Sequence, residues 1–267
     1  IELCSRMIEE RGLRVRAAYM GGGTPTAIPA GALDRILASA QRHFPGAREW
    51  TVEAGRPDTI DREKLSVMLE RGVQRISVNP QTFSDVTLQK IARSMGCEHS
   101  NMDLIAALPE ERVEDFRATL EKVMALNPES VTVHSLAIKR SSKLHEQSYT
   151  QCDAQTASEM VDMARHMLME RGWKPYYLYR QKYMAGNLEN VGFAKGDTIC
   201  RYNILMMEEL CPVVALGAGG VTKICADGGR NITRLTNPKY PKEYIEHSDA
   251  ICQGKQKLEL EFDRLSD

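Results

Sequence analysis

Three consecutive glycines are the residues whose type and spacing most directly suggest a ligand site. Gly21, Gly22 and Gly23 follow the apolar run Val15–Met20 and precede Thr24. Glycine has no Cβ, so this loop can adopt positive φ and expose backbone N–H and C=O groups to a small polar ligand. No Gly-Lys-Ser follows, and no G-x-G-x-x-G opens a helix, so neither a Walker A loop nor a dinucleotide fingerprint is present. A tight turn without a ligand is the alternative.

Polar residues stand at the ends of the later apolar runs. Glu53, the segment Asn79–Gln81, Asp103 and His134 each lie at or near the end of an expected strand. In a β/α barrel these ends meet at one rim, where the chemistry takes place. Two alternatives stay open. Strand ends are polar in any barrel because loops are solvated, and His134 could be a packed histidine bonded to a backbone group.

The cysteines give no metal site. They stand at positions 4, 97, 152, 200, 211, 225 and 252, with no pair two or three residues apart. This scatter is typical of reduced thiols. We interpret each as a small buried hydrophobe and assign no metal ligand among them.

Alternating strands and helices must position the polar strand ends. The expected strands are 15–20, 50–53, 75–78, 102–105 and 130–136. The expected helices are centred on 3–8, 33–40, 65–69, 86–91 and 113–123. This order predicts an α/β fold whose parallel β/α units form a closed or half-closed barrel over residues 1–149.

The regular alternation of strands and helices ends at about residue 150. A long helix at 157–168 precedes short strand-like pieces at 175–179, 202–206, 213–216 and 220–224. These predict a C-terminal α+β extension over 150–267 with a partly antiparallel sheet.

Bulk composition favours small-molecule chemistry. The chain has 267 residues, 42% of them hydrophobic, and a net charge of −1. It can therefore bury a large core, and duplex nucleic acid is not an expected partner. There is no apolar run long enough to span a membrane, and the first residues are too charged for a secretory signal. We expect a cytoplasmic protein.

Several blocks resemble the radical-SAM core of the oxygen-independent coproporphyrinogen III dehydrogenases. The first blocks are YMGGGTPT, VEAGRPDT, ISVNPQTF, NMDLIAALPEE and TVHSLAIKRSSKL. The later blocks PYYLYRQKYMAGNLENVGFA, RYNILMMEE and ALGAGGVTK resemble the HemZ-type branch in particular. The matches run in order from about residue 15 to 255. The resemblance implies a partial parallel (β/α) barrel of the radical-SAM type.

The resemblance also implies a pocket for S-adenosylmethionine (SAM). Glu53 would bind the SAM ribose or amine, and the planar guanidinium of Arg93 suits its carboxylate. Alternatively, Asp103 ties down a loop and Arg93 is a solvated helix end. The implied pocket residues are Gly22, Gly23, Thr24, Glu53, Gln81, Arg93 and Asp103.

The implied reaction is the conversion of coproporphyrinogen III to protoporphyrinogen IX in heme biosynthesis. In this family a 4Fe–4S cluster, fed by an electron donor such as a flavodoxin or ferredoxin, reduces SAM to release a 5′-deoxyadenosyl radical. The radical takes hydrogen from a propionate, and decarboxylation leaves a vinyl group. Two such events complete the reaction.

A tetracarboxylate substrate favours cationic and hydrogen-bonding groups near the pocket. Tyr176, Tyr177 and Tyr179 could stack on a pyrrole ring or donate an O–H. Solvation of the charged residues and strand packing of the tyrosines are the alternatives. The candidate substrate residues are Arg180, Lys182, Tyr177, Lys139 and Arg140.

The sequence departs from the family pattern in two places. The cluster loop C-x3-C-x2-C is absent, so we expect its cysteines upstream of this chain, unless the protein has lost the chemistry. The crossover around Arg93 and Ser94 is short, so we expect residues missing between them. Two other functions stay open: a heme-binding chaperone with the same core, and another radical-SAM reaction on a tetrapyrrole.

Overall fold

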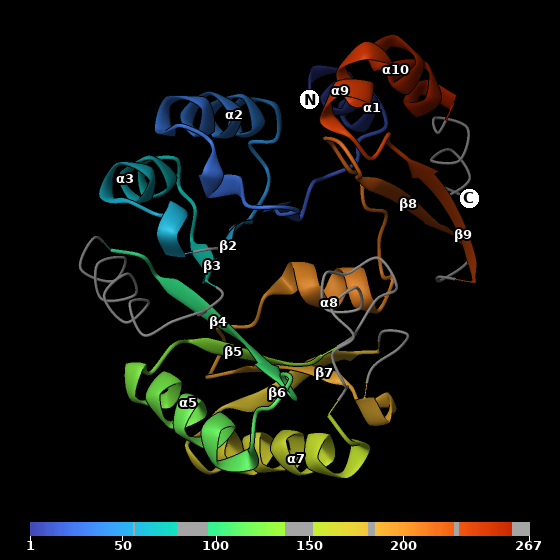
Figure 1. The fold of residues 1–267 in the computed structure, drawn as a ribbon. Coiled ribbons are helices and arrows are strands. Elements are labelled where there is room, and N and C mark those ends of the chain that lie inside the picture. The colour runs from blue at the N-terminus through green and yellow to red at the C-terminus, as the bar shows by residue number, and fades with distance from the viewer. Residues whose placement is uncertain (56, 79–95, 137–151, 181–184, 227–229, 258–267) are drawn as a thin grey trace. The chain divides into compact units, whose positions relative to one another are not determined.

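A seven-stranded sheet forms the frame of the computed structural model (Figure 1). The structure describes residues 1–55, 57–78, 96–136, 152–180, 185–226 and 230–257. The strand order of the large sheet is β1-β2-β3-β4-β5-β7-β6, and β8 pairs with β9 in a separate two-stranded sheet. The strands are β1 (Ala17–Met20), β2 (Glu49–Gly55), β3 (Arg75–Val78), β4 (His99–Ala106), β5 (Ser130–Ser135), β6 (Lys174–Tyr179), β7 (Asn190–Ala194), β8 (Val221–Ala226) and β9 (Asn231–Thr236).

Helices connect the strands. The α-helices are α1 (Glu2–Glu10), α2 (Ala30–His43), α3 (Arg62–Glu70), α5 (Val113–Leu126), α7 (Ala154–Glu170), α8 (Arg201–Met207), α9 (Pro241–Glu246) and α10 (Ser248–Lys257). Short 3₁₀ turns stand at η1 (Pro25–Ala27), η2 (Pro57–Thr59) and η3 (Ala185–Asn187). Strands β2 to β5 pair in parallel, and helices α3 and α5 lie in the connections from β2 to β3 and from β4 to β5.

The sheet continues beyond its parallel part with two antiparallel strands. β7 pairs antiparallel with β5, and β6 pairs antiparallel with β7. The segment Asn190–Ala194, with the sequence NVGFA, is short and has glycine at its centre, so the sequence does not predict β7. It becomes a strand because both of its edges are paired, with Phe193 buried in the core.

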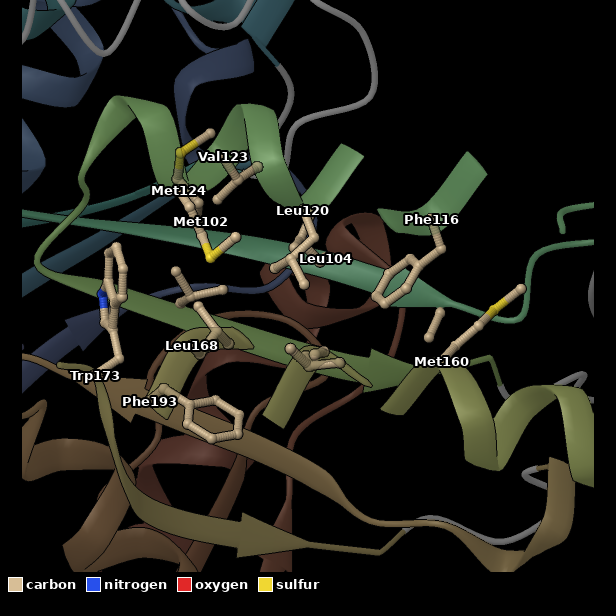
Figure 2. Packing of buried hydrophobic residues seen from close by; sticks show 14 of the residues in the cluster. Met102, Leu104, Phe116, Leu120, Val123, Met124, Met160, Leu168, Trp173 and Phe193 are labelled. Atoms are coloured by element: carbon tan, nitrogen blue, oxygen red, sulfur yellow. The ribbon is translucent and has the colours of Figure 1, made fainter. Parts of the chain in front are cut away.

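One face of the sheet is apolar and covered by helices. Val131 and Val133 on β5 belong to this face. Met102 and Leu104 on β4 and Phe193 on β7 also pack on it (Figure 2). We call it the helix-covered face, and the opposite one the inner face. Successive side chains of a strand point to opposite faces, so the apolar pattern leaves the intervening residues on the inner face. The large side chains of this core are Met102, Leu104, Phe116, Leu120, Val123, Met124, Met160, Leu168, Trp173 and Phe193.

Local signals begin and end the two helices of this core. Asp153 caps α7, where its carboxylate accepts hydrogen bonds from the backbone N–H groups of Gln155 and Thr156 at 3.0 and 2.9 Å. α5 ends where Asn127 adopts a left-handed conformation with φ of 53°. After α7, the Trp173 indole donates to the carbonyl of Pro128 at 3.0 Å, which satisfies its buried N–H.

Contacts between residues divide the chain into two compact units. The unit of residues 19–34 and 50–200 holds most of the large sheet and the core just described. The other unit comprises residues 1–18, 35–49 and 201–267. Within it the ammonium group of Lys255, 3% exposed, donates to the carbonyl of Ala215 at 2.7 Å and to the Thr222 hydroxyl at 3.1 Å. Burial lowers the pKa of Lys255.

The α/β fold with a partial, parallel-dominated barrel is confirmed, but single elements differ from expectation. The strand expected at 202–206 is wrong, because Arg201–Met207 forms helix α8. The carboxylate of Glu49 accepts the backbone N–H groups of Arg201 and Tyr202, and this stabilises a helix start.

Other elements of the later part also differ. The strand expected at 213–216 is wrong apart from a single bridge between Val213 and Lys223, because the chain turns at Gly217 and Gly219, which both have positive φ. β9 was missed. The helix expected at 86–91 lies outside the described residues, and the boundary at residue 149/150 stays a prediction.

In the part of the chain that the structure describes, no helix combines the length and apolarity needed to cross a membrane.

The core of α5 gives a first prediction. Leu120 is fully buried between the helices and the sheet, so Leu120→Ala should lower the free energy of unfolding by about 2–5 kcal/mol. Glu121→Ala, at the exposed neighbouring position, should change it by less than about 0.5 kcal/mol. Urea denaturation monitored by circular dichroism measures both, and equal effects would contradict the assigned helix face.

Candidate functional site

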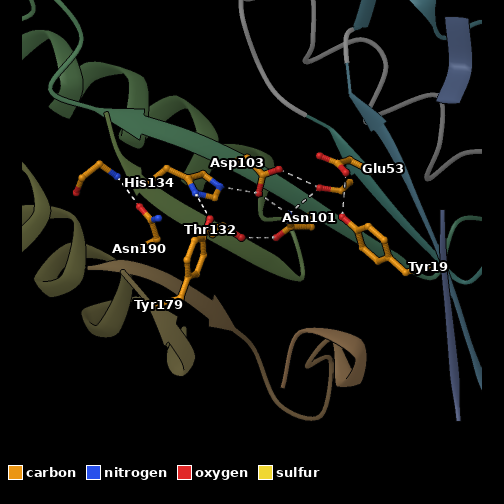
Figure 3. Close-up of polar contacts among 10 residues, drawn as sticks. Tyr19, Glu53, Asn101, Asp103, Thr132, His134, Tyr179 and Asn190 are labelled. Atoms are coloured by element: carbon orange, nitrogen blue, oxygen red, sulfur yellow. Dashed lines mark hydrogen bonds and ion pairs between the residues drawn. The ribbon is translucent and has the colours of Figure 1, made fainter. Parts of the chain in front are cut away.

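The inner face of the sheet is polar where the helix-covered face is apolar (Figure 3). Ser77 on β3, Asn101 and Asp103 on β4, and Thr132 and His134 on β5 belong to it. Neighbouring strands lie about 4.8 Å apart, so these side chains reach one another across the sheet. A partly buried polar face must satisfy its own hydrogen bonds, and these residues do so together.

Asn101 connects three of these side chains. Its Nδ2 donates to Ser77 Oγ at 2.9 Å and to Asp103 Oδ1 at 2.8 Å. Its Oδ1 accepts from the Thr132 hydroxyl at 3.3 Å. The Ser77 hydroxyl in turn donates to Asp103 Oδ2 at 3.1 Å, so both oxygens of the carboxylate are engaged.

His134 extends this chain to the antiparallel part of the sheet. Its Nε2 lies 3.6 Å from Asp103 Oδ1, and its Nδ1 lies 3.3 Å from the phenol oxygen of Tyr179 on β6. The imidazole therefore has a carboxylate on one side and a phenol on the other. The alternative that His134 is a packed histidine bonded to a backbone group is wrong, because both of its ring nitrogens face side chains.

Asp103 is the charged centre of the array. Burial by itself would raise the pKa of its carboxyl, but His134, Asn101 and Ser77 stabilise the charged form and lower the pKa below its ordinary value. Asp103 is therefore ionised at neutral pH, and it can accept hydrogen bonds from a ligand that reaches the inner face.

The glycine loop lies next to a second carboxylate. Tyr19 donates its O–H to Glu53 Oε2 at 3.2 Å. A Cβ on Gly21 would lie 2.6 Å from that oxygen and 2.4 Å from the Tyr19 ring, so this position requires glycine. Gly22 and Gly23 have φ of 80° and 63°, and nothing lies within 4 Å of their Cβ positions. Their backbone is therefore exposed in the way that the sequence predicts for ligand binding.

Hydrogen bonds hold the loop beside β2. The hydroxyl of Thr26, which is fully buried, donates to the carbonyl of Ala54 at 2.6 Å and lies 2.6 Å from the Thr59 hydroxyl. Thr24 packs against Gly55, where a Cβ would lie 3.4 Å from its methyl group. The loop is thus fixed to the end of the strand that carries Glu53.

Aromatic rings line the inner face on β6. Tyr177 and Tyr179 stack with ring centroids 6.3 Å apart and an interplanar angle of 6°. The Tyr177 ring covers Gly192 of β7 so closely that a Cβ there would lie 1.9 Å from the ring. Burial raises the pKa of Tyr177, so its phenol stays protonated.

A buried arginine occupies the start of β3. Arg75 is 3% exposed, and its guanidinium donates to Ser130 Oγ at 3.2 Å and to the carbonyls of Thr198 and Ile199 at 2.7 and 3.0 Å. Arg75 is not among the site residues that the sequence predicts. A single charge inside the buried run RISV was the available signal.

The structure brings part of the predicted site together. Glu53 lies beside the glycine loop, Asp103 lies in the polar array, and Tyr177 lies on the inner face. Arg180 pairs instead with Glu189 at 2.7 Å, on an exposed position. Gln81, Arg93, Lys139, Arg140 and Lys182 lie outside the described residues. The partners Tyr19, Ser77 and Asn101 were missed, because their roles arise from contacts between strands.

The residues present fit SAM better than they fit a cluster. Exposed glycine backbone beside a carboxylate suits an amino acid and a ribose, which both donate and accept hydrogen bonds. No cysteines of the chain are spaced as C-x3-C-x2-C. Among the described residues, no three His, Cys, Asp or Glu side chains are grouped to hold a metal ion. The described residues therefore do not fit a 4Fe–4S cluster, and we assign them no step through one.

The polar array gives a second prediction. Asn101→Asp removes the two donated hydrogen bonds and places a carboxylate against Asp103, so the free energy of unfolding should fall by about 3 kcal/mol at pH 7. Two adjacent carboxylates retain a proton in the folded state, which raises the folded pKa. The loss should therefore be largest above the ordinary carboxyl pKa and shrink as the pH falls towards it.

The matched control is Asn187→Asp, an exposed position at which Asp is sterically tolerated. Its free energy of unfolding should follow that of the unchanged protein from pH 7 to about pH 4.5. A pH-independent loss for Asn101→Asp would show that charge repulsion does not act at this site.

Comparisons with known proteins agree on one group. No protein-family model matches the chain. The chain is 39% identical over 278 residues to the oxygen-independent coproporphyrinogen-III oxidase-like protein HemZ of Bacillus subtilis, covering 96% of this chain and 56% of HemZ. It is 24% identical to the heme chaperone HemW of Escherichia coli, covering 88% of this chain and 63% of HemW. It is 26% identical to an oxygen-independent coproporphyrinogen III oxidase of Cereibacter sphaeroides, over 79% of this chain and 51% of that protein.

A solved structure supports the same fold. The coproporphyrinogen III oxidase HemN of Escherichia coli, described as a radical SAM enzyme, superposes with a TM-score of 0.69 at 20% identity. The match covers 94% of this chain and 62% of HemN. The chain thus spans roughly half to two thirds of these relatives, and within that span it belongs to the oxygen-independent coproporphyrinogen III oxidase-like proteins of the HemZ type, with the radical-SAM fold.

Proposed function

We propose that this protein is a radical-SAM oxidoreductase that converts two propionate groups of coproporphyrinogen III to vinyl groups, forming protoporphyrinogen IX in heme biosynthesis. The match to HemZ across 96% of the chain carries the proposal. The glycine loop and the polar inner face support it, because they offer the exposed backbone and carboxylates that SAM requires.

The proposed SAM pocket uses residues from the loop after β1 and from strands β2 and β4. Gly22, Gly23 and Thr24 hold the amino and carboxylate groups of SAM against the backbone. Glu53 accepts a hydrogen bond from the amine or ribose, and the fixed carboxylate of Asp103 accepts one from a ribose hydroxyl. Gln81 and Arg93 are proposed to complete the pocket.

The bond-breaking, one-electron chemistry belongs to the cofactors. When bound, SAM and a reduced 4Fe–4S cluster supply the one-electron chemistry that removes a hydrogen atom from a propionate. The described residues bind and orient: Tyr19 holds the Glu53 carboxylate, and Asn101 and Ser77 hold that of Asp103. We propose that the cluster cysteines lie outside the chain described here.

The proposed substrate side carries cations and tyrosines. Lys139, Arg140 and Lys182 would bind substrate carboxylates, and Tyr177 would pack against the macrocycle. Arg180 would have to exchange Glu189 for a substrate carboxylate. Its exposed position allows this at modest cost, because surface ion pairs contribute little.

A heme-binding chaperone is the second candidate. The likeness to HemW of Escherichia coli, over 88% of the chain, favours it. A different radical-SAM reaction on a tetrapyrrole would use the same pocket. The proposed reaction loses two molecules of carbon dioxide, which distinguishes it from both.

Turnover by the full-length protein tests the function. The protein is reconstituted anaerobically with iron and sulfide, then incubated with SAM, a reductant and coproporphyrinogen III, and the products are analysed by mass spectrometry. Loss of two carbon dioxide units supports the proposal. Stable heme binding by absorbance, without turnover, would support the chaperone, and a product of different mass another tetrapyrrole reaction.

A third prediction concerns Glu53. Glu53→Gln keeps an acceptor for Tyr19 but removes the charge, so SAM binding should weaken by about tenfold to a hundredfold. Isothermal titration calorimetry measures this affinity. Glu63→Gln, an exposed carboxylate in α3, is the matched control and should bind SAM as the unchanged protein does. Equal affinity in both variants would remove Glu53 from the pocket.

We further propose that the protein works in the cytoplasm with an electron donor such as a flavodoxin or ferredoxin, and without nucleic acid. The net charge of −1 supports the last point.

A further inference from the structure

The array of Asp103, His134 and Tyr179 crosses the inner face from the parallel strands to β6 (Figure 3). Asp103 and His134 are mostly buried, with side chains 15% and 27% exposed. The Tyr179 phenol is the member of the array on β6, the strand that also carries the stacked Tyr177. The array therefore connects Asp103, in the proposed SAM pocket, to the stacked rings of Tyr177 and Tyr179.

The donor and acceptor capacities of the three groups favour one arrangement of the protons. Ionised Asp103 only accepts, so the tautomer of neutral His134 with its proton on Nε2 suits the 3.6 Å approach to Asp103 Oδ1. In neutral imidazole, Nδ1 is then an acceptor, and the Tyr179 O–H donates to it. When His134 gains a second proton, Nδ1–H donates to the phenol oxygen instead. The phenol proton must then point to another acceptor.

The charge of the array changes with the same proton. With neutral His134, Asp103 leaves one negative charge, which repels an incoming anion. When His134 is protonated, its positive charge cancels the negative charge of Asp103. The Tyr179 O–H can then donate to a carboxylate. Both effects favour a carboxylate at the phenol in the protonated state.

The other titratable groups near His134 are carboxylates and phenols. In the described part of the chain, His134 contacts the titratable side chains of Asp103 and Tyr179, and Glu53 and Tyr19 lie farther along the inner face (Figure 3). Tyr177 stacks on Tyr179. Burial raises the pKa of Tyr177 and Tyr19, so both stay neutral near pH 7. Histidine is the side chain that ordinarily changes charge between pH 5 and 8.

We propose that Tyr179 and His134 form a binding site for a carboxylate, which accepts it when His134 is protonated. Resting on the proposed function, the inference assigns this carboxylate to a propionate of the tetrapyrrole. Tyr179 contacts the ligand, and His134 is a positioning residue that acts through Tyr179.

Equilibrium binding of coproporphyrin III, the stable oxidised tetracarboxylate, tests the site. Its fluorescence is titrated with the protein between about pH 5.5 and 8. Affinity for the unchanged protein should fall by about tenfold over this range, and Tyr179→Phe should bind about tenfold more weakly at pH 5.5 while keeping the ring stack.

His134→Gln keeps a donor towards Asp103 but cannot gain a charge. The affinity of this variant should not fall between about pH 5.5 and 8, except for the part of the change that comes from the carboxylates of coproporphyrin III itself. His166→Gln, an exposed histidine of α7, is the matched control and should follow the unchanged protein. Should His134→Gln not fold, Tyr179→Phe alone decides.

The inference is overturned if the unchanged protein and His134→Gln share one pH profile, if Tyr179→Phe binds with unchanged affinity at pH 5.5, or if coproporphyrin III does not bind. Failure of the proposed function is a separate result, because it is read from the mass of the turnover product. Binding with the expected pH profile but no loss of carbon dioxide would keep this site and discard the decarboxylase.

Discussion

The alternation of side chains along each strand is the constraint on which the rest of this structure depends. β4 and β5 place Met102, Leu104 and Val131 against α5 and α7, so the residues between them cannot avoid the inner face. A register slip of one residue would turn Asp103 towards the apolar core, where an unpaired charge costs several kcal/mol. The packing of the core therefore decides which side chains can meet a ligand.

The inner face is ordered before any ligand arrives. Asp103 is held by Asn101 and Ser77, and Glu53 is held by Tyr19, so neither carboxylate is left to rotate. A ligand that binds there does not have to meet the entropy cost of ordering these side chains. The same bonds stabilise the fold, which means that the site and the barrel share part of their stability.

The elements that the sequence predicts correctly are those with a local signal. Apolar runs ending in polar residues located β1 to β5, and the glycine run located an exposed loop that the structure contains. Contacts made across strands leave no such local signal. Nothing near Tyr179 in sequence indicates His134, 45 residues away, and the bond of Tyr19 to Glu53 spans 34. The sequence predicts a strand where helix α8 forms. The residue that caps this helix, Glu49, lies 152 positions before Arg201, so no capping signal stands next to the helix in the sequence.

Arg75 ties together two parts of the chain that are far apart in sequence. Its guanidinium binds the carbonyls of Thr198 and Ile199, 123 and 124 residues later in the chain. A contact that closes so long a loop costs more chain entropy than a local one. The buried hydrogen bonds of a charged donor offset part of that cost, so Arg75 fastens the start of β3 to the segment that follows β7.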